Sequence, residues 1–311
     1  MNIKHTQIHD EVFGKCLKLE GGSIEIVVTL DFGPRIISFR LEDGKNMLFQ
    51  DTEKKPLGEH LDIYDGDILK LYGGHRLWAS PEILPRCYYP DNHSVSFTRI
   101  PNGFHFTAPV EEHVNIKKSF SISFWGKNRV EIQHYIKNYN LWEIELSPWA
   151  ITMLQPGGVA FAPLVNEKSG YLPNRQLVFW DYADPSDARL KVYKDFYSLR
   201  HDADGKNFKM GTAKAKWASY LNHNQMFIKH FHYDSSGAYP DYGCNFEIYT
   251  NEEFLELESL GPIKKIAPNA EVSHIETWEI HKEDAIINTE KDIRDLIGKY
   301  INEYQYSNER D

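Results

Sequence analysis

The sequence predicts an all-β protein with one C-terminal helix, and two observations lead to this fold class. Aromatic residues make up 14% of the 311 residues, and aromatic side chains prefer half-buried strand positions to helices. Short apolar segments with a period of two also alternate with turn signals rich in Gly, Pro, Asn and Asp. The sequence contains no internal repeat and no long linker, so we expect a single domain over residues 1–311.

Nine segments have the pattern of a strand. Their side chains are apolar or alternate between apolar and polar, and turn signals such as DFGP, EDGKN and DADGKN lie between them. In chain order they cover residues 23–30, 34–41, 94–100, 115–124, 129–136, 176–182, 225–231, 253–259 and 274–280. Many strands joined by short turns predict large antiparallel sheets.

One helix is expected, over about residues 289–302. Thr289 is a suitable N-cap residue, and Asp292 three positions later can complete the cap. Apolar side chains then recur at helical spacing, at Ile293, Leu296, Ile297, Tyr300 and Ile301. A helix with a single apolar face is expected to pack on the outside of a sheet.

Charge and cysteine content argue against several classes of protein. The chain has 35 Lys and Arg against 45 Asp and Glu, a net charge of −10, which disfavours nucleic acid and anionic membranes as partners. A small neutral or cationic ligand fits this charge better. The three cysteines, Cys16, Cys87 and Cys244, are odd in number and far apart, which argues against a disulfide framework or a thiolate zinc site. The sequence has no signal-peptide pattern and no bilayer-spanning apolar run, so a cytoplasmic location is expected.

The segment YGGHRLWASPE, residues 72–82, has the composition of a polar pocket rather than of a core. Buried charge is costly unless it is paired, and an aromatic side chain next to a cation often lines a binding site. We expect His75 to contact a ligand; the alternative is a structural hydrogen bond to a carbonyl group of the glycine turn. Glu82 is expected either to hold Arg76 or to touch the ligand itself.

The segment EFLELES, residues 253–259, predicts two carboxylates on one face of a strand. A period of two places Glu256 and Glu258 together and directs Leu255 and Leu257 to the opposite face, toward the core. Neighbouring like charges raise the pKa of a carboxyl group and prepare it for proton transfer near neutral pH. The alternative is that both glutamates face solvent. Other polar residues expected near the ligand are Lys229, His232, Asp241 and Glu247.

A metal site is a weaker alternative. His230 and His232 would share one face of a strand, as ligands do in metal-binding β proteins. Further ligands would have to come from His223 or Glu247, and no established spacing supports that set. We therefore expect no metal ion and no cofactor. The sequence also lacks a GxSxG elbow, a phosphate-binding P-loop and a GxGxxG motif, which argues against nucleophilic and phosphate chemistry.

Four segments spread along the chain resemble a known family. They are YGGHRLW (72–78), LSPWAIT (146–152), YPDYGCNFEIYTNEEFLELESLGP (239–262) and HIETWEI (274–280). Together they resemble the galactose mutarotase-like superfamily, and most closely its bacterial DUF4380-like branch. The resemblance implies a β-supersandwich of two large antiparallel sheets, the concave one of which binds a monosaccharide or oligosaccharide. Aldose 1-epimerases of this superfamily interconvert the anomers of free hexoses without a cofactor.

The resemblance also implies roles for individual residues. In anomer exchange, a base takes the proton of the anomeric hydroxyl while an acid protonates the ring oxygen, so that the ring opens and recloses. The base of the epimerases is a glutamate in a segment like L-E-x-Q, and its best counterpart here is Glu258. The early glycine-containing segment implies that His75 and Arg76 lie at sugar hydroxyls and that Trp78 lies against a sugar face.

One departure from the family pattern concerns the acid. The epimerases carry a general-acid histidine in a central segment of the H-x-Y-F-N-L type, where this sequence has Pro148 and Trp149. Either His75 or another histidine, such as His232 or His274, supplies the acid, or the protein binds sugar without isomerising it. A polysaccharide lyase or hydrolase domain is a further alternative. Trp149 is expected either at the ligand or in the core, where its indole N–H would need a buried acceptor.

Overall fold

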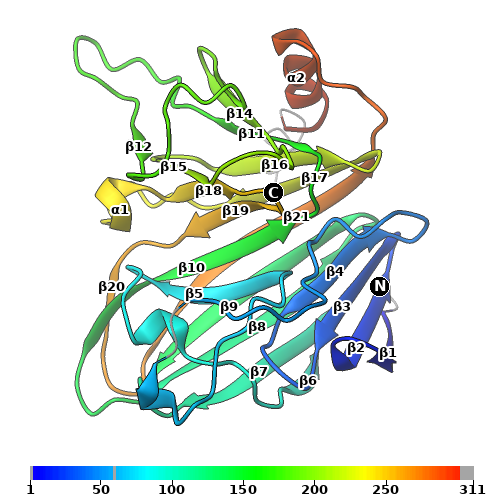
Figure 1. Cartoon of the computed structure of the whole chain (residues 1–311), viewed down its shortest axis with the longest axis vertical. Helices are drawn as coiled ribbons and strands as arrows, with labels where there is room; N and C mark the ends of the chain where they lie inside the picture. The colour runs from blue at the N-terminus through cyan, green and yellow to red at the C-terminus, as the bar shows by residue number, and fades with distance from the viewer. Residues whose placement is uncertain (1–2, 59–60, 302–311) are drawn as a thin grey trace.

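Two large antiparallel sheets pack face to face in the computed structural model, which describes residues 3–58 and 61–301 (Figure 1). In spatial order, the described part of the first sheet contains β1 (Lys4–Asp10), β2 (Gly14–Gly21), β3 (Ile24–Thr29), β4 (Ile36–Leu41), β5 (His75–Ser80), β10 (Ile144–Leu154), β19 (Leu255–Leu260), β18 (Phe246–Thr250), β15 (Phe208–Thr212) and β12 (Leu177–Phe179), with β20 (Lys264–Ile266) paired to β10.

The second sheet has the longest strands at its centre. In spatial order, its described strands are β13 (Leu190–Val192), β14 (Phe196–Arg200), β11 (Val159–Pro163), β16 (Trp217–Asn222), β17 (Gln225–Phe231), β21 (Glu271–Lys282), β9 (Arg129–Asn138), β8 (Ile116–Trp125), β7 (Gly103–Glu111) and β6 (Ser96–Ile100). The predicted all-β sandwich is confirmed. Within the described residues, no helix is both long enough and apolar enough to cross a bilayer.

The main apolar core lies between the two sheets. Phe39 of β4 contributes from the first sheet, and its ring makes edge contacts with Phe227 and Trp278 of the second sheet at centroid distances of 5.7 and 5.2 Å. The alternation of buried side chains along β9 shows the period-two pattern that the sequence predicts for residues 129–136. Burial of one face of each strand fixes the register of both sheets.

The C-terminal helix packs on the outside of the second sheet. It comprises α2 (Glu290–Leu296) and a π-helical turn, η3 (Ile297–Ile301); residue 302 of the predicted helix lies outside the described residues. The predicted capping box is confirmed, because the Thr289 hydroxyl and the Asp292 carboxylate each accept a backbone N–H of the other residue. Its apolar face joins a cluster with Phe161 and Ile228. The shorter helical turns are η1 (Asp62–Tyr64), η2 (Arg86–Tyr88) and α1 (Pro240–Gly243).

The first sheet has little backbone pairing between β4 and β5. These strands meet through one residue pair, Ile36 with His75, whereas β5 pairs with β10 along its whole length. The glycine turn of the YGG segment precedes this point, and Gly74 has a φ of +72°. A Cβ atom on Gly74 would lie 2.3 Å from the carbonyl oxygen of Ile36, so only glycine permits this approach of the two strands.

All nine predicted strand segments overlap strands of the structure. The pattern does not predict β5, β10, β15 or β18, which together carry most of the candidate site. Two glycines precede β5, Pro148 lies within β10 and Gly211 lies within β15. Each of these features weakens a period-two signal.

Candidate functional site

Five neighbouring strands, β5, β10, β19, β18 and β15, carry the candidate site on one face of the first sheet. Trp78 pairs with Trp149, and Glu258 pairs with Glu247. Side chains alternate between the faces of a strand, so these residues point away from the second sheet. We call the following set the outer-face site: Arg76, Trp78, Trp149, Lys209, Glu247, Glu256 and Glu258.

Lys209 is the centre of this site. Its Nζ lies 2.9 Å from Glu247 Oε2 and 2.9 Å from Glu258 Oε2. It also lies 4.7 and 4.8 Å from the ring centroids of Trp149 and Trp180. Trp149 Nε1 donates a 2.8 Å hydrogen bond to Glu258 Oε2, so one oxygen of this carboxylate receives two donors. The buried acceptor that the sequence requires for the indole of Trp149 is therefore Glu258.

Burial perturbs the two other carboxyl groups. Desolvation, reinforced by the charge of Glu258, raises the pKa of Glu256 to about 8, although Arg76 opposes the shift. Desolvation also raises the pKa of Glu247 well above its ordinary value, against the attraction of Lys209. Burial lowers the pKa of Lys209, but the two carboxylates beside it outweigh this effect and raise the pKa well above its ordinary value. Near neutral pH the site thus holds the charged ammonium group of Lys209 and a Glu256 carboxyl group that retains its proton.

Several buried polar atoms of the outer-face site have no hydrogen-bond partner among the described residues. They are Arg76 Nε and Nη1, Glu247 Oε1 and Glu258 Oε1. Buried polar groups are bonded in the great majority of cases, and leaving one unbonded costs about 1–3 kcal/mol. The arrangement therefore suits a ligand that carries several hydroxyl or other polar groups.

The rim of the site includes residues from three loops. Glu82 is exposed and accepts a hydrogen bond from the Tyr88 hydroxyl, while the guanidinium of Arg76 lies 4.1 Å from the ring centroid of Trp78. Tyr182 is 47% exposed, yet Lys209 and Glu258 both affect the pKa of its hydroxyl, which places it at the edge of the site.

Asp241 lies in the α1 turn, close enough for its charge to raise the pKa of Glu247. This residue was expected near the ligand, and it flanks the outer-face site rather than forming its floor.

The fold of this chain matches solved structures across most of its length, although no protein-family model and no curated protein matches its sequence. A galactose mutarotase-like protein from Clostridium acetobutylicum is 12% identical, with a TM-score of 0.52 over 90% of this chain and 98% of that chain. A protein proposed to be a mutarotase, from Salmonella typhimurium, is 11% identical, with a TM-score of 0.58 over 90% and 94% of the two chains. A proposed aldose 1-epimerase from Klebsiella pneumoniae is also 11% identical, with a TM-score of 0.59 over 91% and 83%. The chain has the galactose mutarotase-like fold. At these identities the likeness shows the fold alone, and the DUF4380-like branch stays a prediction.

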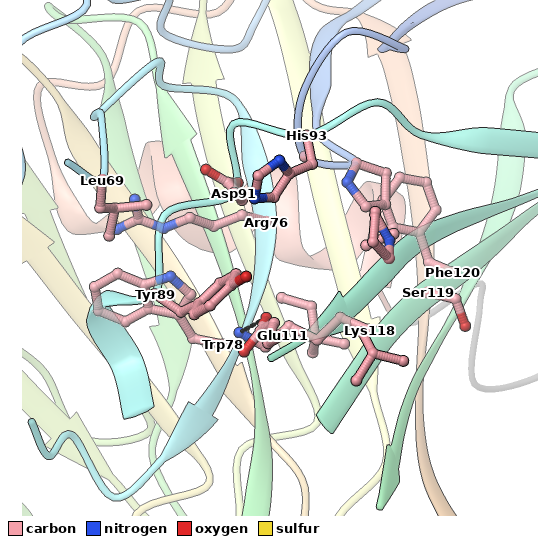
Figure 2. A pocket seen from close by; sticks show the side chains of 16 residues that line it. Leu69, Arg76, Trp78, Tyr89, Asp91, His93, Glu111, Lys118, Ser119 and Phe120 are labelled. Carbon is pink, nitrogen blue, oxygen red and sulfur yellow. Dashed lines mark ion pairs between the residues drawn. The ribbon is translucent and has the colours of Figure 1, made fainter. Parts of the chain in front are cut away.

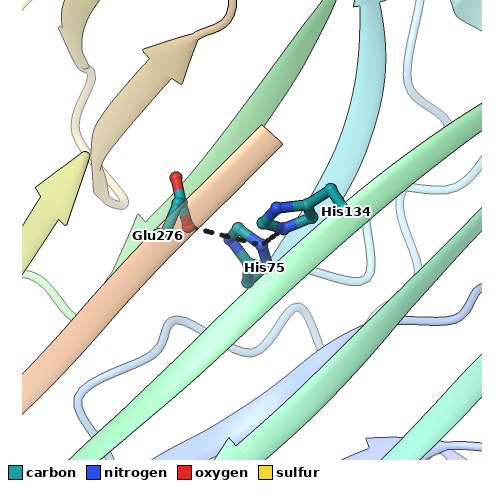
Figure 3. Close-up of side chains that lie close together, drawn as sticks. All are labelled: His75, His134 and Glu276. Atoms are coloured by element: carbon teal, nitrogen blue, oxygen red, sulfur yellow. Dashed lines mark hydrogen bonds and ion pairs between the residues drawn. The ribbon is translucent and has the colours of Figure 1, made fainter. Parts of the chain in front are cut away.

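In this mutarotase-like fold, His75 lies between the sheets, on the face of β5 opposite to Arg76 and Trp78 (Figure 3). His75 Nδ1 lies 2.9 Å from Thr152 Oγ1, and Nε2 lies 2.7 Å from His134 Nε2 of the second sheet. The sequence led us to expect His75 and Glu258 at one sugar, but the sheet separates them. The cause is the period of two, which turns His75 inward when Arg76 points outward.

The hydrogen bonds around His75 assign a role to each ring nitrogen. His134 Nδ1 lies 3.1 Å from the carbonyl oxygen of His274 and must donate to it, so His134 Nε2 accepts from His75 Nε2–H. His75 Nδ1 then accepts from the Thr152 hydroxyl. Burial lowers the pKa of His134 to about 3 and that of His75 well below its ordinary value, in agreement with neutral rings. His75 therefore has the structural role that was the alternative, with side chains as partners.

Lys229 also lies between the sheets, although the sequence led us to expect it at the ligand. Its Nζ lies 2.7 Å from Glu276 Oε1 and donates to the carbonyl oxygens of Ala150 and Leu257 at 2.9 and 3.0 Å. Lys229 thus bridges the second sheet to the backbone of β10 and β19, the strands that carry Trp149 and Glu258. Lys229 therefore does not belong to the outer-face site.

The remaining histidine candidates also lie away from the outer-face site. His274 is buried, with Nε2 2.7 Å from Ser259 Oγ on the inner side of β19. His232 is exposed beyond the end of β17, and His230 faces Glu279 within the second sheet. His230 and His232 therefore do not converge with Glu247 on a common metal position.

One group of potential metal ligands does exist between the sheets. The ligand atoms of His75, His134 and Glu276 all lie within 4.8 Å of one another. The 2.7 Å separation of the two imidazole nitrogens is that of a hydrogen bond, and Glu276 is the partner of Lys229. The other donors and acceptors of this group are bonded to residues outside it, which are Thr152, His274, Lys229, Ser259 and Trp278.

Sequence reasoning missed Lys209, Trp180 and Tyr182. The signal for Lys209 is present but weak: a single lysine stands between Phe208 and Met210 in a short apolar segment, which indicates a buried cation that needs a carboxylate partner. Its partners follow about 40 or more residues later in the chain, so no local spacing connects them.

Proposed function

We propose that this protein binds a sugar on the outer face of the first sheet and interconverts its anomers, as an aldose 1-epimerase does. The observation that carries this proposal is that two different carboxyl groups lie on one face of β19. Glu258 is held by Lys209 and Trp149, and Glu256 has a pKa raised to about 8. The fold provides the scaffold, and these two carboxyl groups provide an acid and a base on one strand.

The two glutamates would have different roles in ring opening. Glu258 has one oxygen held by Lys209 and Trp149, and its free Oε1 is available to accept the proton of the anomeric hydroxyl. Glu256 keeps its proton near neutral pH and is suited to protonate the ring oxygen. Rotation and reclosure reverse both transfers. Glu256 would thus replace the histidine acid of the epimerases.

Non-catalytic sugar recognition is the second candidate. The observation that favours it is the ion pair between Lys209 and Glu258, because a carboxylate held by a buried ammonium and an indole can accept hydrogen bonds from sugar hydroxyls without taking a proton. In that case Trp78 and Arg76 would contribute binding, and anomers would exchange at the rate of the buffer alone.

Magnetisation-exchange NMR on a panel of free aldoses tests the proposal. The wild-type protein should accelerate exchange for at least one aldose, and Glu258→Gln should lower the rate about 100-fold or more. Glu143→Gln, a change at a glutamate that is 54% exposed, is the matched control and should behave as wild type. Chemical-shift changes without faster exchange would favour recognition. If no aldose shows shifts or exchange, the proposed function is wrong.

A further inference from the structure

Arg76 is a buried cation with incomplete hydrogen bonding. The residue is only 5% exposed, and its Nε and Nη1 have no hydrogen-bond partner in the described part of the chain. These nitrogens belong to different edges of the guanidinium plane, so each edge has a free donor. Burial lowers the pKa of Arg76 to about 10, and the group stays charged at neutral pH.

A small cavity adjoins this guanidinium (Figure 2). It has a volume of about 40 Å³ and is lined by Arg76 and Trp78 of β5, by Tyr89 and His93, and by residues of β7 and β8. One water molecule needs roughly 10–15 Å³ on this measure, so the cavity has room for a group of a few atoms.

The other charges around the cavity have counter-charges. Asp91 receives two hydrogen bonds from Arg35, of 2.8 and 3.0 Å. Glu111 Oε1 lies 2.9 Å from Lys118 Nζ, and burial raises the pKa of Glu111, whose Oε2 has no partner among the described residues. Arg76 is left without a hydrogen-bonded carboxylate in the described lining of this cavity.

We propose that the sugar bound at the outer-face site carries a carboxylate, as a hexuronic acid does, and that Arg76 binds this carboxylate. The inference rests on the proposed function, because Arg76 shares its face with Glu256 and Glu258. A planar carboxylate matches the edge of a guanidinium group and supplies the hydrogen-bonded anion that Arg76 lacks.

Two other substituents match the site less well. A hydroxyl group would satisfy one N–H but leave the buried cation without a hydrogen-bonded carboxylate. A phosphate dianion would bring a second negative charge that no unpaired cation of the described lining balances. The net charge of −10 for the whole chain does not oppose a carboxylate, because exposed charges farther away than a Debye length of about 8 Å are largely screened at physiological ionic strength.

Binding isotherms for matched sugars test the inference. D-glucuronate and D-glucose, and D-galacturonate and D-galactose, differ only at C6 and are titrated into the wild-type protein and into Arg76→Met. One uronate should bind the wild type at least 10-fold more tightly than its hexose. Arg76→Met should weaken uronate binding at least 10-fold more than hexose binding. Arg99→Met, at an exposed arginine of β6 in the other sheet, is the matched control and should keep the preference.

Two results would overturn the inference while leaving the proposed function intact. One is equal binding of uronate and hexose when the hexose still binds and its anomers still exchange. The other is tighter binding of a hexose 6-phosphate than of the uronate. If Arg76→Met does not fold, Arg76→Lys keeps the charge but loses the planar fork, and it should retain only part of the preference. Failure of every sugar to bind or exchange would contradict the proposed function as well.

Discussion

Trp149 donates its indole N–H to Glu258 Oε2 over 2.8 Å, and the two residues lie on the adjacent strands β10 and β19. Lys209 Nζ donates a second hydrogen bond, of 2.9 Å, to the same oxygen. The segment LSPWAIT, residues 146–152, thus supplies a hydrogen-bond donor to Glu258. This leaves Oε1 of Glu258 as the atom that can meet a ligand.

Replacing Trp149 by Phe should weaken this arrangement without removing the aromatic ring. A hydrogen bond to a charged group contributes about 1.5–3 kcal/mol, so Trp149→Phe should lower the free energy of unfolding measured in urea by an amount in this range. Trp180→Phe removes an indole that makes a ring contact with Lys209 but has no described hydrogen bond to Glu258, and its effect should be smaller. Equal effects of the two changes would contradict the role assigned to the Trp149 N–H.

Glu256 should make the folded protein less stable as pH rises. Its folded-state pKa of about 8 lies above the ordinary value of 4.5, so the folded state binds the proton more tightly than the unfolded state between these values. The stability from this proton is complete below about pH 4.5 and is lost as pH rises through about 8, at up to about 1.4 kcal/mol per pH unit. Glu256→Gln should therefore gain stability relative to wild type from pH 5 to pH 8 in urea unfolding. A constant difference would contradict the raised pKa.

The buried histidines should have the opposite effect at acid pH. Burial lowers the pKa of His134 and His274 to about 3 and that of His75 well below 6.5. A depressed folded-state pKa gives stability that is complete above about 6.5 and is lost as pH falls. Each histidine should cost up to about 1.4 kcal/mol per pH unit below this value.

Urea unfolding of Glu256→Gln and of Glu256→Gln/His134→Gln between pH 7 and pH 4 isolates the effect of His134, because the opposing contributions of Glu247 and Glu111 are common to both variants. The stability of the first variant relative to the second should fall as pH falls, and a constant difference would show that the His134 ring is not held neutral between the sheets.

Lys229 should be important for stability because it is the described counter-charge of Glu276. Lys229→Met leaves a buried carboxylate uncompensated and should cost about 3–5 kcal/mol in urea unfolding. The double variant Lys229→Met/Glu276→Gln removes both charges and should recover part of that loss. Lys291→Met removes an exposed helix ion pair with Asp295 and should cost less than about 1 kcal/mol. A double variant that is less stable than Lys229→Met would contradict this account.

Period-two reasoning predicts part of the candidate site correctly. It places Glu256 and Glu258 on one face of a strand and Leu255 and Leu257 in the core, and the structure confirms both placements. The same reasoning would place His75 and Arg76 on opposite faces of a strand, but the two residues follow Gly73 and Gly74, and their segment shows no strand signal of its own. Only the pairing of β5 with β10 in the structure shows which face of the sheet each of the two side chains occupies.

Long-range strand pairing accounts for what the sequence does not reveal. Lys209 reaches Glu258 because β18 lies between β15 and β19, and the order of these strands is a property of the whole sheet. Lys229 has the same residue type and a similar apolar setting, yet it belongs to the second sheet and meets Glu276. Composition and spacing treat these two lysines alike, and only the assignment of strands to sheets distinguishes them.

The single pair between Ile36 and His75 divides the first sheet into two parts of unequal importance for the ligand. The strands β1 to β4 lie on one side of this row, and every strand that carries the outer-face site lies on the other. Amide protons along β4 should therefore open to solvent exchange as a group separate from those of β10 and β19. Detachment of β1 to β4 would leave the strands that carry the outer-face site hydrogen-bonded to one another.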